Sequence, residues 1–317
     1  MKEIGGYLEL DDLVSHEYHP SAIALNTARN ALVYLAKAKH ISKLYIPYFL
    51  CDSVVGVCRR EGIAYELYHI DESFCPSFDG QLGENEYLYV VNFYGQLTKE
   101  KILELRLKYE RIIVDNVHAF FEHQVEGVDT LYSCRKFFGV PDGAYLYCDI
   151  RDIRLETDVS MNRMKHILGR YEGASASEYY NDFRSNDMLF DELPLKSMSK
   201  LTKNILGAID YEKIKQIRND NWRSIHERVG INNKLNVKAP NGPYMYPFWC
   251  ENGAAVRKLL AEKKIYIPTL WPNVLELDGC ALEKEYAKNI LPLPIDQRYG
   301  EEDIERVANE LKNALKV

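Results

Sequence analysis

The sequence predicts an α/β fold, in which a mainly parallel sheet carries helices on both faces and a smaller α+β domain follows. Between residues 26 and 148, short β-rich runs alternate with helical stretches, which is typical of βα units that build a parallel sheet. A polar, less regular stretch from about 150 to 195 then interrupts this alternation. We therefore expect a large α/β domain over residues 1–205 and a small α+β domain over residues 206–317.

The elements of the first part are expected in a definite order. Apolar residues at three- and four-residue spacings predict helices over 27–40 and 98–110, the second behind a Thr cap. Enrichment in β-branched and aromatic residues predicts six strands, over residues 44–47, 64–70, 87–93, 111–115, 129–133 and 144–148. Ligands of such sheets bind at the carboxyl ends of the strands, so a site is expected there.

The second part shows a different alternation. Long helical patterns run to about residue 228. They are followed by predicted strands over 244–249, 265–272 and 290–296 and by predicted helices over 251–264 and 301–315. This mixture is typical of an α+β domain.

Composition excludes several classes of protein. The 317 residues are 46% hydrophobic and carry a formal net charge of −7, which disfavours a general nucleic-acid binder. No apolar run is long enough to span a bilayer, and the first twelve residues carry acids where a signal peptide carries bases. We expect a cytoplasmic protein without nucleic-acid or membrane partners.

Cysteine and histidine spacing points to no metal site. The seven cysteines form no Cys-x-x-Cys pair, so neither a disulfide framework nor a zinc site is predicted. Most are expected to be buried, with Cys134, two residues before Lys136, as an alternative candidate for a reactive thiol. The pair His16 and His19 has no acidic or sulfur partner nearby, and we interpret it as a loop or surface pair.

Three short segments of the first part are candidates for chemistry. The strand that ends at Asp115 is followed by His118, and a carboxylate at a strand end can hold a proton on a ligand's ring nitrogen. The alternative is an Asp that caps a helix and a His without a function. Lys136 follows another strand among aromatic residues, so desolvation can turn its amine into a nucleophile. The turn after it, with Gly143, favours a fixed backbone shape.

The third candidate is the start of the first predicted helix. Free backbone N–H groups and the helix dipole make such a start a site for an anion. Thr27, Ala28, Arg29 and Asn30 stand there, and three of these side chains add donors suited to a phosphate. An ordinary capped helix is the alternative interpretation.

Taken in order, these segments resemble the DegT/DnrJ/EryC1/StrS family of pyridoxal-phosphate (PLP) dependent sugar aminotransferases. The resemblance continues through Met198-Ser199 in a helix, through residues 267–272 and into residues 290–307. It implies the PLP-dependent transferase type I fold, with a mainly parallel seven-stranded sheet and a smaller carboxy-terminal α+β domain. It also implies PLP as the cofactor and a homodimer with shared active sites.

The resemblance assigns a role to each candidate residue. Lys136 would hold PLP as a Schiff base, Asp115 would pair with the pyridine nitrogen, and His118 would lie near the ring and its phenolic oxygen. Thr27 to Asn30 would bind the phosphate, and Ser133 would contribute to the cofactor site. An aromatic side chain is expected on the other face of the ring, with Tyr48 and Phe49 as equal candidates. Arg298 is a weaker candidate for binding a substrate anion, because an Arg in a charged turn is as often solvated.

The implied reaction is transamination of a keto sugar, expected to be nucleotide-linked, with glutamate as the typical donor. Departures from the family pattern accompany it: Arg29 stands where the family has a hydroxyl, and Leu195 where it has an asparagine that reaches the partner subunit. Two alternatives remain. A PLP-dependent sugar dehydratase is disfavoured because those relatives have histidine in place of the lysine. A non-catalytic protein with a structural or regulatory role is the other.

Overall fold

A computed structural model describes residue 8, residues 10–13 and residues 16–316. The expectation about a signal peptide rests on the amino-terminal segment, most of which lies outside these described residues. Among them, no helix is both long and apolar enough to cross a membrane.

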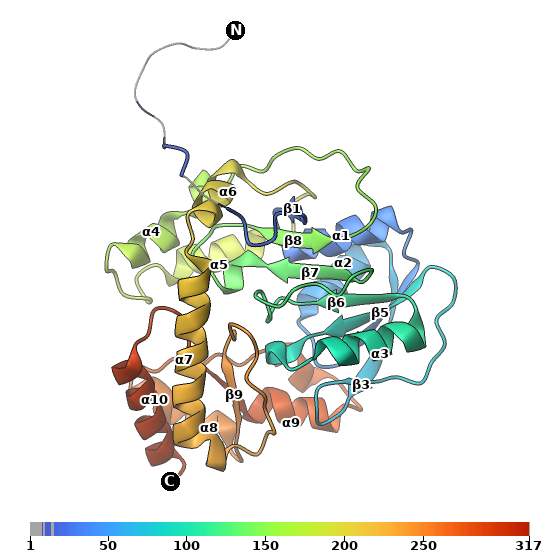
Figure 1. The fold of residues 1–317 in the computed structure, drawn as a ribbon. Helices are drawn as coiled ribbons and strands as arrows, with labels where there is room; N and C mark the ends of the chain where they lie inside the picture. Colours follow the sequence, from blue (N-terminus) through green and yellow to red (C-terminus); the bar gives the residue numbers. More distant parts are fainter. Residues whose placement is uncertain (1–7, 9, 14–15, 317) are drawn as a thin grey trace.

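An eight-stranded sheet runs through the large part of the molecule (Figure 1). Its spatial order is β1-β8-β7-β6-β5-β2-β3-β4. The five strands from β7 to β3 pair in parallel, whereas β8, β1 and β4 pair antiparallel with their neighbours. The strands are β1 (Ile23–Leu25), β2 (Lys43–Pro47), β3 (Ala64–Ile70), β4 (Pro76–Ser77), β5 (Glu86–Val91), β6 (Ile112–Asp115), β7 (Asp129–Ser133) and β8 (Ala144–Tyr147).

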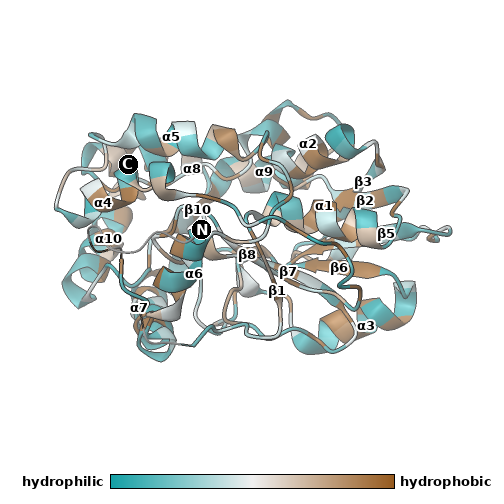
Figure 2. Ribbon diagram, turned by 90° about the horizontal axis from the view of Figure 1, so that it is seen from above, coloured by the Kyte–Doolittle hydropathy of each residue, from teal (hydrophilic) through white to brown (hydrophobic). Residues whose placement is uncertain are grey.

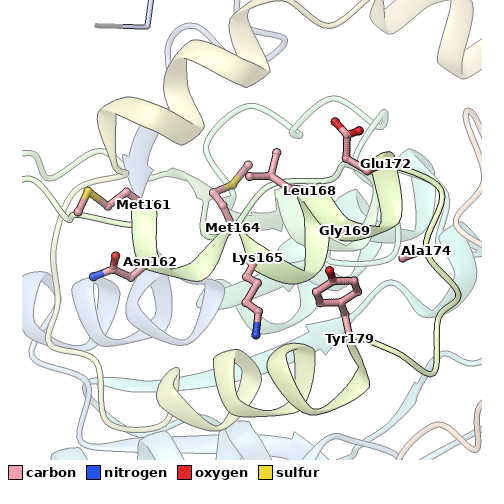
Figure 3. Close-up of a pocket in the computed structure, with 9 residues that line it drawn as sticks. All are labelled: Met161, Asn162, Met164, Lys165, Leu168, Gly169, Glu172, Ala174 and Tyr179. Atoms are coloured by element: carbon pink, nitrogen blue, oxygen red, sulfur yellow. The ribbon is translucent and has the colours of Figure 1, made fainter. Parts of the chain in front are cut away.

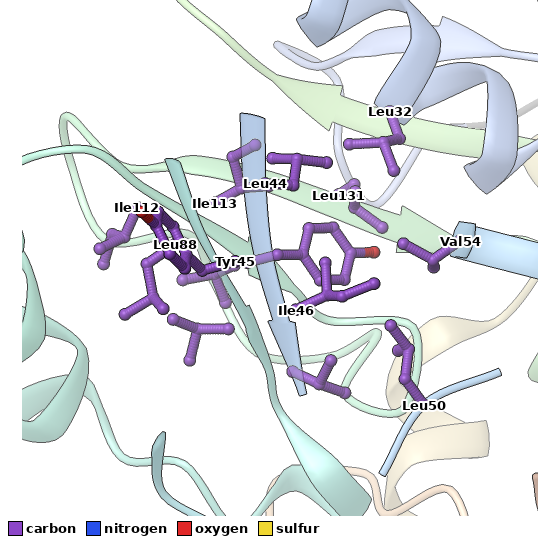
Figure 4. Close-up of a cluster of buried hydrophobic side chains, with 14 of the residues drawn as sticks. Leu32, Leu44, Tyr45, Ile46, Leu50, Val54, Leu88, Ile112, Ile113 and Leu131 are labelled. Carbon is purple, nitrogen blue, oxygen red and sulfur yellow. The ribbon is translucent and has the colours of Figure 1, made fainter. Parts of the chain in front are cut away.

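Helices cover both faces of this sheet. α3 (Lys99–Tyr109) lies on one face, and α1 (Ala28–Ala38) and α2 (Asp52–Glu61) lie on the other (Figures 1 and 2). The central strands are buried from both sides, so every residue of β6 and β7 is buried, and β6 is a continuous apolar run up to Asp115 rather than an alternating one. Leu44, Ile46, Leu88 and Ile113 are each fully buried in this core (Figure 4), and each such side chain contributes about 1.5–3 kcal/mol.

The carboxy-terminal part has its own hydrophobic cluster. It is formed by α7 (Tyr211–Val229), α8 (Gly253–Glu262), α10 (Glu301–Ala314) and the antiparallel pair β9 (Tyr246–Trp249) and β10 (Ile290–Leu293). In contrast, α9 (Ala281–Asn289) packs with the core of the large sheet. The mixed α/β fold class is therefore confirmed, while the division at residues 205 and 206 stays a prediction.

Helices connect the two parts. α4 (Lys165–Tyr171), α5 (Tyr180–Leu189) and α6 (Lys200–Gly207) follow the large sheet. Five short 3-10 segments complete the described chain, namely η1 (Phe93–Gly95), η2 (Cys134–Lys136), η3 (Met161–Arg163), η4 (Gly230–Asn232) and η5 (Pro272–Glu276).

Several predicted elements need correction. The strand expected over 265–272 does not form, because Pro268 and Pro272 cannot donate to a ladder and Trp271 has a positive φ of 54°. The stretch called irregular contains α4 and α5, and α2, α9, β1 and β4 were not predicted. The sheet has eight strands rather than seven, the added β4 being two residues long. Ser199 precedes α6 as its N-cap instead of lying inside a helix.

Candidate active site

Lys136 and His118 meet beyond the carboxyl ends of two parallel strands. Lys136 ends η2 directly after β7, and His118 follows β6, so neighbouring parallel strands bring both to one edge of the sheet. The Lys136 Nζ atom lies 3.0 Å from Nε2 of His118. Burial and the nearby charge of Lys136 hold the pKa of His118 well below its ordinary value, so its ring is neutral and Nε2 can accept this hydrogen bond.

Burial and four nearby groups shift the pKa of the Lys136 amine. Burial lowers its pKa, because desolvation disfavours the charged ammonium. The electrostatic influence of Cys51 and of the Asp115 carboxylate raises the pKa of this amine, whereas the charges of Arg135 and Arg29 lower it. The net direction is downward, so a larger fraction of Lys136 is the neutral, nucleophilic amine than for a solvated lysine.

Asp115 lies buried at the end of β6, with 4% of its surface exposed. Its Oδ2 accepts a hydrogen bond of 2.7 Å from the Tyr89 hydroxyl on β5, and its Oδ1 accepts one of 2.9 Å from the Val117 N–H. Burial raises the pKa of this carboxyl, and these two hydrogen bonds together with the charge of Lys136 oppose that shift. The site therefore holds a carboxylate that is desolvated yet well bonded.

Three aromatic rings that the sequence did not point to surround His118. Tyr244 stacks on it at 4.6 Å between ring centroids, Trp271 stacks on it at 5.5 Å, and Tyr94 lies tilted at 5.5 Å. Tyr94 and Trp271 both have a φ of 54°, which is costly for bulky residues. Such strain gathers at functional sites, where the surrounding structure enforces it. Positive φ values are invisible in sequence, although Tyr94-Gly95 is a turn signal.

The helix start that was expected to bind phosphate forms as predicted, but its side chains have partners. Thr27 Oγ1 accepts the Asn30 N–H at 3.0 Å as the N-cap of α1. The Asn30 amide donates to Asn26 Oδ1 and to the carbonyls of Leu193 and Pro194, so it holds the chain segment after α5. Arg29 pairs with the Asp191 carboxylate of that segment, and Ala28 begins the helix.

The remaining predicted residues lie at different distances from this cluster. Ser133 is buried at the end of β7, three residues before Lys136. Phe49 is 1% exposed and packs on Phe93 and Trp271 in the core, whereas Tyr48 stacks on His69 at 4.7 Å. Among the described residues, the cation–π contact of Lys136 is with Tyr244 and not with Tyr48 or Phe49, so the choice between these two stays open.

Arg298 is bound to its own loop. Its guanidinium donates to both carboxylate oxygens of Asp296, at 2.7 and 2.8 Å, and lies over the Tyr299 ring. The ion pair raises its pKa above the ordinary arginine value. Its role as a substrate ligand therefore stays a prediction that requires Asp296 to share it with a substrate.

Arg218 on α7 is a further residue that sequence reasoning missed. It is 1% exposed and donates to Pro243 O at 2.9 Å and to Tyr244 O at 3.3 Å. It also donates to Phe137 O at 3.3 Å, directly after Lys136. Burial lowers its pKa to about 10. Arg218 thus ties the lysine loop to the loop that carries Tyr244, and only the tertiary structure shows this long-range pairing.

Comparison with solved structures then places the fold. The chain is similar to a protein described as a sugar aminotransferase, Spr1654 of Streptococcus pneumoniae in its PLP form, with TM-score 0.67 and 13% identity over 93% of this chain and 87% of that one. A DegT DnrJ EryC1 StrS aminotransferase from Brucella abortus gives TM-score 0.63 and 14% identity over 92% and 85% of the two chains. PseC of Helicobacter pylori, an aminotransferase involved in the biosynthesis of pseudoaminic acid, gives 0.60 and 14% over 96% and 87%.

This chain has the DegT/DnrJ/EryC1/StrS aminotransferase fold. The resemblance stated from the sequence motifs is thereby confirmed at the level of fold. No protein-family model and no curated protein sequence matches the chain. Sequence comparison alone therefore does not place it, because the aminotransferase fold persists here at an identity of 13–14%.

Two other features of this aminotransferase fold lie apart from the Lys136 cluster. Ligand atoms of Asp129, Cys148 and Asp149 come within 4.8 Å of one another. Lys39 Nζ lies 2.7 Å from Asp129 and 2.8 Å from Asp149, so an ammonium already pairs with both carboxylates of this group. A surface hollow at α4 shares no lining residue with the Lys136 cluster (Figure 3).

Proposed function

We propose that this chain is a PLP-dependent aminotransferase that transfers an amino group from glutamate or a similar donor to a nucleotide-linked keto sugar. The observation that carries the proposal is the contact of 3.0 Å between Lys136 Nζ and His118 Nε2 beside the buried Asp115 carboxylate. The aminotransferase fold and the sugar aminotransferases named above support it. A cytoplasmic homodimer is part of the same proposal.

The residues at the site fit this cofactor. An aldehyde needs a neutral amine, and burial lowers the pKa of Lys136 in that direction. A ring nitrogen needs a carboxylate, which Asp115 provides. Nδ1 of His118 is buried without a hydrogen-bond partner among the described residues, so it is left to bond a ligand oxygen. When bound, PLP would supply an aldehyde carbon and a ring that takes up an electron pair.

Each residue would then have a distinct task. Asp115 would keep a proton on the ring nitrogen, with Tyr89 and the Val117 N–H holding its carboxylate in place. Lys136 would bind the cofactor and, once free, move a proton through Nζ as a general base. His118, which stacks on Tyr244 and on Trp271, would fix the direction of that amine.

The test is a half-reaction with the full chain. Purified protein supplied with PLP is expected to show the visible absorbance of lysine-bound cofactor and to lose it on addition of glutamate, with formation of pyridoxamine phosphate. Lys136→Ala should abolish both changes, and Lys108→Ala, an exposed lysine on α3, should leave them intact. Absence of any visible band would refute a PLP enzyme. A band that glutamate does not change would contradict transamination from this donor.

A further inference from the structure

Two arginines stand beside Lys136 at the expected phosphate site. Arg29 lies in the first turn of α1, and Arg135 directly precedes Lys136. Both side chains are 18% exposed, and both lower the pKa of the Lys136 amine through their charge. Burial lowers the pKa of Arg135 to about 10, with the charge of Arg29 adding to this shift and Asp187 opposing it. Positive charges this close together repel one another and are stabilised by negatively charged partners.

The end of α5 supplies those anions. Arg29 Nε lies 2.9 Å from Asp191 Oδ1, and Arg135 Nη2 lies 3.1 Å from Asp187 Oδ1. The Arg135 guanidinium also lies 3.7 Å over the Phe190 ring. Carboxylates at a helix carboxyl end oppose the helix dipole, and the last turn of α5 holds no basic residue. The ion pairs with the two arginines therefore stabilise acids that the helix dipole alone would disfavour.

The two carboxylates are accessible although the chain around them is anchored. Asn186 is the one buried residue of α5 among those described, and Phe190, which directly follows the helix, is fully buried. Near its start, Tyr179 lines the surface hollow together with Lys165 of α4 (Figure 3). The Asp187 and Asp191 side chains are 50% and 62% exposed, whereas Phe190 between them is fully buried. Both carboxylates can therefore turn from the arginines to solvent while Phe190 stays in the core.

We propose that Arg29 and Arg135 form a clamp for a dianionic phosphate monoester, and that Asp187 and Asp191 occupy this clamp until a phosphate displaces them. Guanidinium groups pair with phosphate oxygens through two parallel hydrogen bonds, and the α1 start adds its dipole. Identifying the phosphate as that of PLP rests on the proposed function. Phosphate binding then releases both carboxylates to solvent.

Calorimetric titration of the cofactor-free full chain with inorganic phosphate tests the clamp. The double variant Asp187→Asn/Asp191→Asn keeps the side-chain shapes and removes both competitors, so phosphate should bind more tightly by roughly two- to fivefold per exposed pair. Arg135→Gln should weaken it. The control is Asp182→Asn, also on α5, which removes a pair of 3.0 Å with Lys165 instead. Equal phosphate affinity in the double variant and this control would overturn the clamp.

A second measurement covers the case in which Arg135→Gln does not fold. PLP and pyridoxal share the aldehyde but only PLP carries the phosphate, so the ratio of their affinities reports the clamp. This ratio should rise in the double variant and stay unchanged in Asp182→Asn. If neither aldehyde gives a visible band, the proposed function fails while the phosphate titration still decides the clamp. If PLP binds, but the double variant changes neither the ratio of PLP to pyridoxal affinity nor the phosphate affinity, the clamp alone is wrong.

Discussion

The hydrogen bond from Tyr89 to Asp115 offers a sharp test of how the site holds its carboxylate. Both side chains are buried, 1% and 4% exposed, and the hydroxyl lies 2.7 Å from Oδ2. Tyr89→Phe removes one of two hydrogen bonds to a charged acceptor, each of which contributes about 1.5–3 kcal/mol. Tyr211→Phe is the matched control, because that buried hydroxyl donates to a neutral carbonyl, Leu206 O, where about 1 kcal/mol is at stake.

The pKa of Asp115 determines how the destabilisation by Tyr89→Phe changes with pH. Burial already raises the pKa of Asp115, so its charged form weakens the folded state as pH rises through that pKa. Loss of the Tyr89 hydrogen bond raises this pKa further. The extra destabilisation of Tyr89→Phe should therefore be present at neutral and alkaline pH and shrink on acidification, once Asp115 is protonated.

Urea unfolding of the cofactor-free protein at pH 8 and pH 5 measures both effects. At pH 8, Tyr89→Phe should lose about 1 kcal/mol more free energy of unfolding than Tyr211→Phe. PLP affinity should also fall, by about tenfold for each 1.4 kcal/mol transferred to binding. Equal losses in the two variants, or a loss in Tyr89→Phe that does not depend on pH, would refute a carboxylate at Asp115 that Tyr89 stabilises.

Two further predictions concern the lysine loop. Lys136→Met should stabilise the cofactor-free protein by about 1–2 kcal/mol at pH 7, because it removes a buried amine. The pKa of Lys136 is lowered on folding, so the wild-type chain regains stability as pH rises towards the ordinary lysine value, and the gain measured by thermal unfolding should shrink above pH 9. Gly143→Ala should cost about 1–3 kcal/mol in urea unfolding, since φ is 115° and a Cβ would lie 3.0 Å from Thr202 and 3.2 Å from Cys134.

One result would contradict each of the predictions for Lys136→Met and Gly143→Ala. A gain from Lys136→Met that is the same at pH 7 and pH 10 would show that the amine is not desolvated. Gly279 also has a positive φ, of 77°, but open space around it, so Gly279→Ala carries the backbone cost alone. Equal losses for the two glycine variants would show that close packing against Cys134 and Thr202 adds nothing.

Local sequence patterns predicted much of the sheet. The strand over 64–70 forms over those residues, and helix starts at Thr27 and Thr98 appear as N-caps because a side-chain oxygen meets its own helix. The strand predicted over 265–272 was wrong. The apolar residues of this segment suggested a strand, but its prolines prevent the pairing that a strand needs. α5 was not predicted because most of its residues are exposed, which leaves little apolar periodicity to read.

By itself, the sequence determined the six longer strands of the large sheet and the candidacy of Asp115, His118 and Lys136, since strand ends of a parallel sheet converge on one edge. Only the tertiary structure decided what those residues touch. The Tyr89 hydroxyl on Asp115, the aromatic rings around His118 and the buried Arg218 come from segments far apart in the chain. The physical reason is that burial and distance set the charge state of each group, and neither is encoded in the spacing of residues along the sequence.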